Sequence, residues 1–331
     1  MGSCVAVAAG ASLARGEEAA AGPTVNTVLG PVSPETLGPT LMHEHLLVDF
    51  IGAAQVSRAR YDRDVVVARM LPLLEQVRAE GGRTVVDATP AWIGRDPELL
   101  ALLSTASGIA IVTTTGYYGA AEDKFLPAHA WTESAAALAA RWIAEARDGI
   151  EGTCIRPGIV KIGVDKGALS EIDAKLVRAA AITHKATGLP IASHTPDGVA
   201  AVAQLDLLAA EGVPAGAFIW VHAQSETDRA VHRALAEHGA WIEFDGISDA
   251  TLDLHVSLVL EMRARGLLGQ TLVSHDAGWY HVGEPGGGDV RPFTPMFEKF
   301  LPALRKAGVS AAEKRQLIVD NPRMALVPRR A

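Results

Sequence analysis

The stretch Leu41-Met42-His43-Glu44-His45-Leu46-Leu47-Val48 places two histidines two residues apart within an apolar run. In a β-strand, residues i and i+2 point to the same face, about 6.6 Å apart at about 3.3 Å per residue. Two imidazoles placed in this way can bind one metal ion, while Glu44 points to the opposite face. The stretch therefore predicts a metal site built on a strand.

Four later apolar runs each end in, or are directly followed by, a single polar residue that can act in such a site. These residues are Lys161, His194, His222 and Asp276. Imidazole and carboxylate ligands bind zinc, manganese, cobalt or iron, and the softness of the ligand atoms alone does not distinguish among these metals. The pattern predicts that ligands from distant parts of the chain meet at one place.

Eight short runs rich in β-branched and apolar residues follow one another along the chain. They cover residues 41–48, 84–89, 109–115, 158–164, 190–194, 218–222, 241–244 and 271–274. Runs that are apolar at nearly every position suit strands buried on both faces, as in a parallel sheet.

The segments between these runs carry helical signals. Residues 63–80 show apolar spacing close to 3.6 and stop at Gly81-Gly82. Ser170 can cap a helix over residues 171–187, and further helices are expected over 197–211 and 226–238.

Eight strand–helix units without a linker or a composition break predict an α/β fold, a single (β/α)8 TIM barrel domain over residues 23–331. A doubly wound open sheet is the alternative, but it would not bring ligands from the first and last strands to one point. In a barrel the carboxyl ends of all strands face one mouth, where functional residues gather.

The composition limits the partners of this chain. Its 331 residues are 49% hydrophobic and 21% charged, with a formal net charge of −8 and a pI near 5.8. An acidic chain without a basic patch argues against nucleic acid or an anionic membrane as a partner, and no apolar stretch is long enough to span a bilayer. A small-molecule substrate is therefore expected.

The first 22 residues are rich in alanine and glycine, and we expect them to form a disordered extension. Residues 4–9 resemble a short apolar signal region, but the basic residues that should precede it are missing, because Arg15 is the first. A cytoplasmic location is expected, with export to the periplasm as the alternative.

Lys161 has the wrong charge for a metal site. An ammonium group would be repelled by two divalent cations, so burial and cationic neighbours favour its neutral amine. A neutral amine can react with carbon dioxide to give an anionic carbamate whose two oxygens could bridge two metals. A carboxylated Lys161 is therefore expected.

These motifs together resemble the phosphotriesterase family of the amidohydrolase superfamily, over residues 25–326. The matching residues are His43-Glu44-His45, Val160-Lys161-Ile162, Ser193-His194-Thr195, Val221-His222 and Ser274-His275-Asp276. An HxH motif alone is a weak signal, whereas the ordered set, each member on its expected strand, is specific.

The resemblance implies a binuclear metal-dependent hydrolase, with two divalent ions of which zinc is preferred and manganese, cobalt or iron are alternatives. By resemblance, His43, His45 and Asp276 hold the buried metal, and His194 and His222 hold the more exposed one. Carboxylated Lys161 bridges both, and a metal-bridging hydroxide attacks an ester-type bond.

The resemblance also implies that Asp276 takes a proton during the reaction, and that barrels of this family are often homodimers. Tyr118 matches the aromatic position that lies against the metal pair in the lactonases, where a phenol could contact the substrate. Packing at the barrel rim is the alternative role for Tyr118.

The chain departs from the family pattern at two positions. Gly246 follows Asp245, where phosphotriesterases and their lactonase relatives carry His or Arg, and Ser225 stands where the organophosphate enzymes use an acidic residue in a proton relay. We therefore expect lactones or carboxylic esters to be favoured over organophosphate triesters. A mononuclear amidase or deaminase and a catalytically silent small-molecule-binding barrel remain alternatives.

Overall fold

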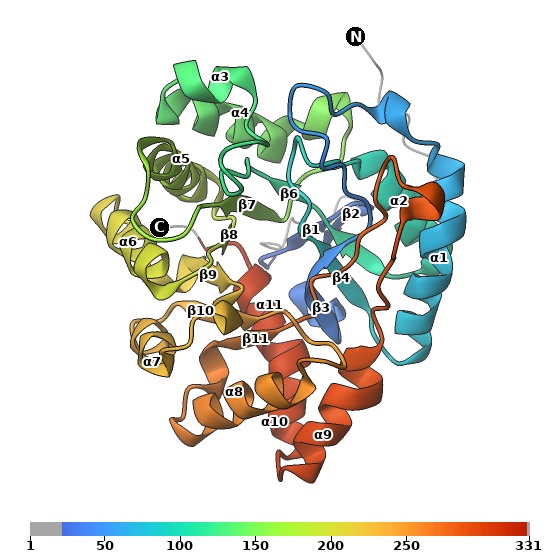
Figure 1. Ribbon diagram of the computed structural model, residues 1–331, viewed down its shortest axis with the longest axis vertical. Helices are drawn as coiled ribbons and strands as arrows, with labels where there is room; N and C mark the ends of the chain where they lie inside the picture. The colour runs from blue at the N-terminus through green and yellow to red at the C-terminus, as the bar shows by residue number, and fades with distance from the viewer. Residues whose placement is uncertain (1–21, 330–331) are drawn as a thin grey trace, which may run out of the picture.

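The computed structural model describes residues 22–329 and shows strands enclosed by a ring of helices (Figure 1). The disordered extension expected over residues 1–22 therefore lies, apart from Gly22, outside the described residues. Among the helices of the described part, none is both long enough and apolar enough to cross a bilayer.

Eight strand positions make up the barrel, and they match the eight predicted runs. In chain order they are β3 (Thr40–His45), β4 (Thr84–Asp87), β5 and β6 (Ala110–Val112 and Thr114–Thr115), β7 (Ile159–Gly163), β8 (Ile191–His194), β9 (Phe218–Val221), β10 (Trp241–Phe244), and β11 and β12 (Thr271–Val273 and Ala277–Gly278).

All pairings among these strands are parallel, and they form a six-stranded ladder from β6 to β11 and a four-stranded ladder β12-β3-β4-β5. The two ladders share two chain segments, since β5 continues into β6 after Thr113 and β11 continues into β12. The amide of Asp276 donates to the carbonyl of His43 at 2.9 Å, which joins the last strand position to the first. The predicted (β/α)8 barrel is therefore confirmed.

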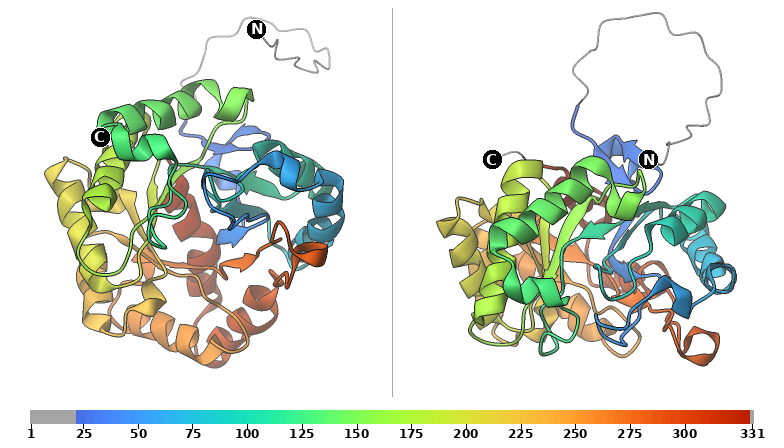
Figure 2. Two further views of the ribbon diagram at one scale, coloured as in Figure 1. Left: turned by 45° about the horizontal axis from the view of Figure 1, so that its top comes forward. Right: turned by 90° about the horizontal axis from the view of Figure 1, so that it is seen from above.

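Helices connect successive strands on the outside of the barrel, as Figures 1 and 2 show. The connecting helices are α1 (Arg63–Ala79), α2 (Pro97–Ser107), α3 (Ala128–Thr132), α4 (Ala135–Asp148), α5 (Glu171–Thr187), α6 (Gly198–Ala210), α7 (Arg229–Glu237) and α8 (Leu252–Ala264). Three more helices follow β12, the last strand: α9 (Leu301–Lys306), α10 (Ala311–Arg315) and α11 (Asn321–Leu326).

Side-chain caps fix where several of these helices begin. Ser170 and Asp173 form a reciprocal capping box at the start of α5, as Ser170 predicted. The helix expected from residue 226 begins only at Arg229, because the Asp228 side chain accepts a hydrogen bond from the amide of Ala230. The predicted start was three residues early for this reason.

The hairpin of β1 (Val25–Thr27) and β2 (Gly30–Val32) lies at the amino-terminal end of the barrel strands. Val25 is fully buried, and the Asn26 side chain donates to the carbonyl of Pro157 at 3.0 Å, just before β7. Inside the barrel, Val25 belongs to one apolar cluster with Ile159, Ile219, Trp241 and Leu272. This cluster closes one end, so polar side chains gather at the other.

Candidate metal centre

The structure brings all six predicted metal-site residues to one cavity at the carboxyl end of the barrel. His43 and His45 end β3, Lys161 lies in β7, His194 ends β8, His222 follows β9 and Asp276 precedes β12. All six line a cavity of about 80 Å³, together with Tyr118 and Trp279. This is the end at which barrels carry functional residues.

His43, His45 and Asp276 form a compact set of donor atoms. The Nε2 atoms of the two histidines are 3.2 Å apart, and the Asp276 Oδ1 lies 3.2 Å from His45 Nε2 and 3.8 Å from His43 Nε2. Ligands about 2.0–2.1 Å from a tetrahedral zinc ion are about 3.3 Å from one another. The spacing of these atoms therefore fits a first metal ion.

Asp245, which follows β10, fixes the orientation of two histidines. Its Oδ2 accepts from His43 Nδ1 at 2.9 Å and its Oδ1 from His222 Nδ1 at 2.7 Å. With the proton on Nδ1, the Nε2 atom of each ring keeps its lone pair for a metal. Burial opposes ionisation of Asp245, yet the adjacent histidines hold its pKa well below the usual range.

Further hydrogen bonds hold the HxH strand in place. His45 Nδ1 lies 2.8 Å from the hydroxyl of Thr89. Glu44, on the opposite face, accepts from the Ser274 hydroxyl at 2.9 Å and contacts His275 Nδ1 at 2.6 Å. Glu44 and His275 thus have the supporting roles expected for side chains that point away from the mouth.

Lys161 is buried, and its Nζ atom has no hydrogen-bond partner. Burial is the main cause that lowers the Lys161 pKa to about 8, against the raising effect of Asp245 and Glu243. A buried amine without a partner is costly unless another group completes it. The atom that the resemblance assigns to carboxylation is therefore the one that the fold leaves unsatisfied.

His194 and His222 lie face to edge on the other side of the cavity, with ring centroids 4.5 Å apart. The Tyr118 hydroxyl contacts His194 Nδ1 at 3.1 Å and also lines the cavity. Burial raises the pKa of Tyr118, which keeps the phenol protonated as a donor. The Tyr118 ring also packs on Phe125, so Tyr118 both lines the cavity and packs at the barrel rim, and contact with a substrate stays a prediction.

Two site residues adopt left-handed backbone conformations that non-glycine residues rarely use. His222 has φ of 64° and Asp276 has φ of 51°. Such conformations cost about 1–3 kcal/mol each and cluster at functional sites. The fold therefore holds these two predicted ligands in place against local strain.

Trp279 follows the last predicted strand, and its place in the sequence is consistent either with lining the substrate pocket or with packing on the barrel rim. Its Nε1 donates to Asp276 Oδ1 at 3.2 Å, and its ring lies 5.4 Å from His45 and 5.3 Å from Phe50, measured between centroids. Burial opposes ionisation of Asp276, but the bond from His45 and the other histidines lower its pKa to about 2. Asp276 is therefore an anion at neutral pH.

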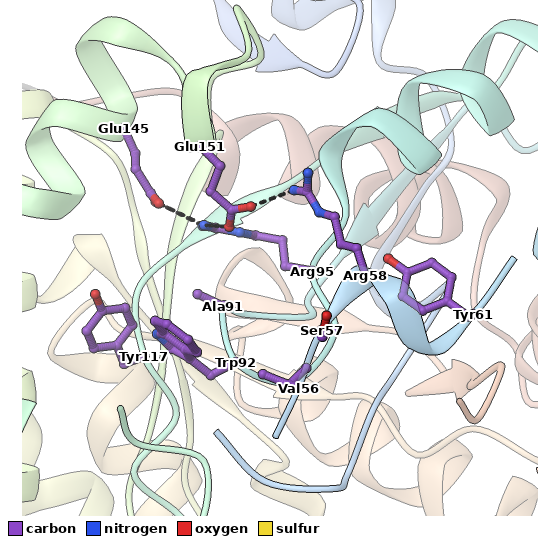
Figure 3. A pocket seen from close by; sticks show the side chains of 11 residues that line it. Val56, Ser57, Arg58, Tyr61, Ala91, Trp92, Arg95, Tyr117, Glu145 and Glu151 are labelled. Carbon is purple, nitrogen blue, oxygen red and sulfur yellow. Dashed lines mark hydrogen bonds and ion pairs between the residues drawn. The ribbon is translucent and has the colours of Figure 1, made fainter. Parts of the chain in front are cut away.

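A larger cavity, of about 280 Å³, lies outside the metal centre between the β4–α2 loop and α4. Figure 3 shows that its charged groups are paired with one another: Arg95 reaches Glu145 and Glu151 at 2.7 and 3.0 Å, and Arg58 reaches Glu151. Among the described residues, neither group of potential metal ligands lies in this cavity. The smaller cavity is therefore the candidate reaction site.

Three histidines outside the site differ from expectation. We expect histidines in helices to be solvated or to cap helix ends, but His184, His232 and His255 are buried. Each contacts a backbone carbonyl, of Leu189, Ala223 and Thr251 respectively, at 2.7–2.9 Å. They pack within the helical layer, and the expectation of solvent exposure is wrong for them.

Known proteins resemble this chain over almost its whole length. It is 29% identical to the phosphotriesterase homology protein of Escherichia coli, over 88% of this chain and 98% of that protein. It is 27% identical to the phospho-furanose lactonase of Mycoplasmopsis agalactiae, over 91% of each. The structure of an organophosphorus hydrolase from Deinococcus radiodurans matches with a TM-score of 0.81 and 29% identity, over 92% of this chain and 98% of that one.

The similarity extends to a profile of the phosphotriesterase family, which matches residues 23–326. This range contains the whole barrel and every residue of the metal centre described above. The chain therefore belongs to the phosphotriesterase family.

Proposed function

We propose that this chain is a binuclear metal-dependent hydrolase that cleaves an ester-type bond, with lactones or carboxylic esters favoured over organophosphate triesters. The observation that carries the proposal is the triangle of His43, His45 and Asp276 beside the buried, unpartnered amine of Lys161. His194 and His222 supply donors for a second ion, and carboxylated Lys161 would bridge the two.

The residues of the chain divide the work of the reaction. Bound divalent ions supply a hydroxide nucleophile at neutral pH and polarise the scissile bond. Asp276, held by Trp279 Nε1 through Oδ1, is the carboxylate that accepts the proton released during attack. The Tyr118 hydroxyl, beside His194, is placed to donate to an oxygen of the substrate.

The walls of the cavity support a neutral substrate. Val48, Phe50 and Ile93 contribute apolar surface, and Trp279 adds an aromatic one. Among the described residues that line it, Lys161 is the only lysine or arginine, and carboxylation would remove its positive charge. A phosphate or sulfonate on the substrate would therefore meet no other lysine or arginine among the lining residues, and Arg291 beside the cavity already contacts the Trp279 ring and the Asp276 carbonyl.

The structure also bears on the preference against organophosphate triesters. Gly246 has no side chain, and a Cβ there would lie 2.9 Å from the Gln224 amide nitrogen, which donates to Asp245. Gln224 thus lies where a side chain at position 246 would begin. Ser225 is exposed and is no substitute for an acidic relay residue.

A substrate panel tests the proposal. Purified protein loaded with zinc or manganese should hydrolyse a lactone or an aryl ester faster than a phosphotriester, and Asp276→Asn should abolish the activity. Activity that survives this substitution would remove Asp276 from the reaction. One metal ion per chain would instead favour the mononuclear alternative, and no bound metal would favour the silent barrel.

A further inference from the structure

Glu243 is a buried carboxyl group that the proposed reaction does not use. It lies in β10, is 1% exposed, and its Oε1 has no hydrogen-bond partner. A carboxyl group is rarely buried in a barrel interior without a partner, because leaving it unsatisfied is unfavourable. A hydrogen-bond donor for Glu243 Oε1 is therefore expected in the functional form of the protein.

Strand alternation places Glu243 inside the barrel below the metal centre. Trp241 belongs to the interior apolar cluster and Asp245 bonds the metal-site histidines, so Glu243, between them, points to the same side. Its register partner on β11 is Leu272, another member of that cluster. Glu243 therefore occupies the layer between the apolar floor and the ligands.

Lys161 is the second buried group in this layer whose polar atom has no partner. Lys161 and Glu243 are close enough for the charge of each to shift the pKa of the other. Yet within residues 22–329 no ion pair or hydrogen bond joins them. The barrel thus holds an unsatisfied donor and an unsatisfied acceptor near each other.

Carboxylation of Lys161 would change what its nitrogen needs. Nζ of the neutral amine forms a bond to the carbon of CO2, the electron pair of one C=O bond moves to oxygen, and one proton leaves Nζ for solvent. The product keeps one N–H. If its two oxygens bind metal ions held by the histidines in the cavity, this N–H would need an acceptor on the inner side.

The other carboxylates around Lys161 and Glu243 are already occupied. Asp245 accepts from His43, His222 and Gln224, and Glu44 accepts from Ser274, His275 and the amide of Ala277. Asp276 contacts His45 and Trp279 through Oδ1 at the mouth. Glu243 Oε1 is the buried carboxylate oxygen of this region that can still accept a hydrogen bond.

We propose that Glu243 is a positioning residue whose Oε1 accepts the remaining N–H of carboxylated Lys161 and so stabilises the bridge for the metal pair. This inference rests on the proposed function, because it needs Lys161 to be carboxylated. One oxygen lone pair is enough for this role, because the carbamate has a single N–H to donate. A glutamine, with its carbonyl oxygen, should therefore replace it.

The test measures carboxylation and metal content rather than turnover. Full-length wild type, Glu243→Gln, Glu243→Leu and the interior packing control Leu272→Ala are stripped of metal and then equilibrated with zinc and increasing ¹³C-bicarbonate. The carbamate signal is followed by ¹³C NMR, with Lys161→Met to assign it, and metal per chain is measured by mass spectrometry. Circular dichroism checks that each variant is folded.

We expect Glu243→Leu to need at least about tenfold more bicarbonate for half-maximal carbamate, which corresponds to about 1.4 kcal/mol. Glu243→Gln and Leu272→Ala should stay within about threefold of wild type. A folded Glu243→Leu that carboxylates at the wild-type bicarbonate concentration would overturn the inference. If the leucine variant does not fold, a folded Glu243→Gln that loses the carbamate would overturn it equally.

Failure of the proposed function would look different. In that case wild type itself would give no carbamate signal that depends on Lys161, and the role of Glu243 would fall with it. A wild-type signal that is unchanged by Glu243→Leu would overturn only the role of Glu243.

Discussion

Single carboxylates organise the metal centre, and Asp245 illustrates how. One side chain holds His43 and His222, from strands on different sides of the barrel, with their Nε2 atoms free. The two rings lie 5.0 Å apart between centroids. The orientation of both histidines therefore depends on the single carboxylate of Asp245.

Asp245→Asn tests this dependence. An amide keeps one acceptor oxygen and gains a donor, so it cannot accept from both Nδ1 atoms. Metal affinity, measured by competition with a chelator, should fall about 10–100-fold. Asp249→Asn, an exposed aspartate paired with Lys299, is the control and should bind metal like wild type. Equal affinity of all three proteins would contradict the orienting role.

The charge state of Lys161 predicts how metal loading depends on pH. Burial lowers its pKa to about 8, below the ordinary value, so the proton is lost as pH rises through about 8. Only the neutral amine can be carboxylated, so two-metal loading of the stripped protein should rise over this range. Loading is measured at constant dissolved CO2. Two-metal loading that is as complete at pH 6 as at pH 9 would contradict this account.

The residues that sequence reasoning found are those with an unusual chemical type for their position. Histidine, lysine and aspartate at the ends of apolar runs stand out without a structure, and all of them reach the cavity. Thr89 carries no such signal, since a threonine after a strand is ordinary, and for Trp279 the sequence favours pocket lining and rim packing equally. Their contacts with His45 and Asp276 arise only from the packing of loops.

At the scale of the elements, the close approach of β6 to β7 determines where Lys161 lies along the barrel axis. Gly116 follows β6 with φ of 112°, and a Cβ there would lie 2.1 Å from the carbonyl oxygen of Lys161. Only a residue without a side chain allows the two backbones to approach this closely. The position of Lys161 therefore depends on a glycine in the neighbouring segment.

Gly116→Ala should displace β7 and disturb Lys161. We expect the free energy of unfolding to fall at least about 2 kcal/mol more than in Gly167→Ala, and the second metal to be lost. Gly167 is a matched control, because it also has a positive φ, 89°, but open space around its Cβ position. The measurements are urea unfolding and metal content. Similar losses in both variants would attribute the effect to backbone strain alone.

The bounds of a helix were predictable where the spacing of its apolar residues and its capping residues indicate the same ends. The helix over Glu171–Thr187 has the predicted bounds, because Ser170 caps it and Gly188 ends it in a left-handed conformation. The start of α7 was missed because Asp228 and Glu226 are both plausible first-turn residues, and only the bond to the Ala230 amide decides. Propensity alone does not choose between such neighbouring caps.

Across the whole molecule, the metal centre lies where the barrel closes. Its predicted ligands come from β3, β7, β8, the end of β9 and the segment before β12, so the site joins strands across the molecule. Eight alternating strand and helix patterns predict this closure, because a barrel unites the first and last ligands. The register that places Asp276 beside His43 was not predictable, since it depends on the irregular stretch between β11 and β12.

Removal of metal should therefore destabilise the barrel as a whole. Ions that bind only the folded chain stabilise it by about 4 kcal/mol at a thousandfold excess over Kd. Stripping with a chelator should lower the midpoint of thermal unfolding by several degrees, and adding zinc back should restore it. Asp276→Asn should show a smaller change. An identical midpoint with and without metal would argue that these residues do not bind it.

The most direct measurement is a crystal structure of the zinc-loaded protein with anomalous scattering at the zinc edge. The account predicts two peaks about 3.5–4 Å apart, one beside His43, His45 and Asp276 and one beside His194 and His222, with additional density on Lys161 Nζ that connects them. A single peak, together with an unmodified Lys161 side chain that contacts no ion, would contradict it.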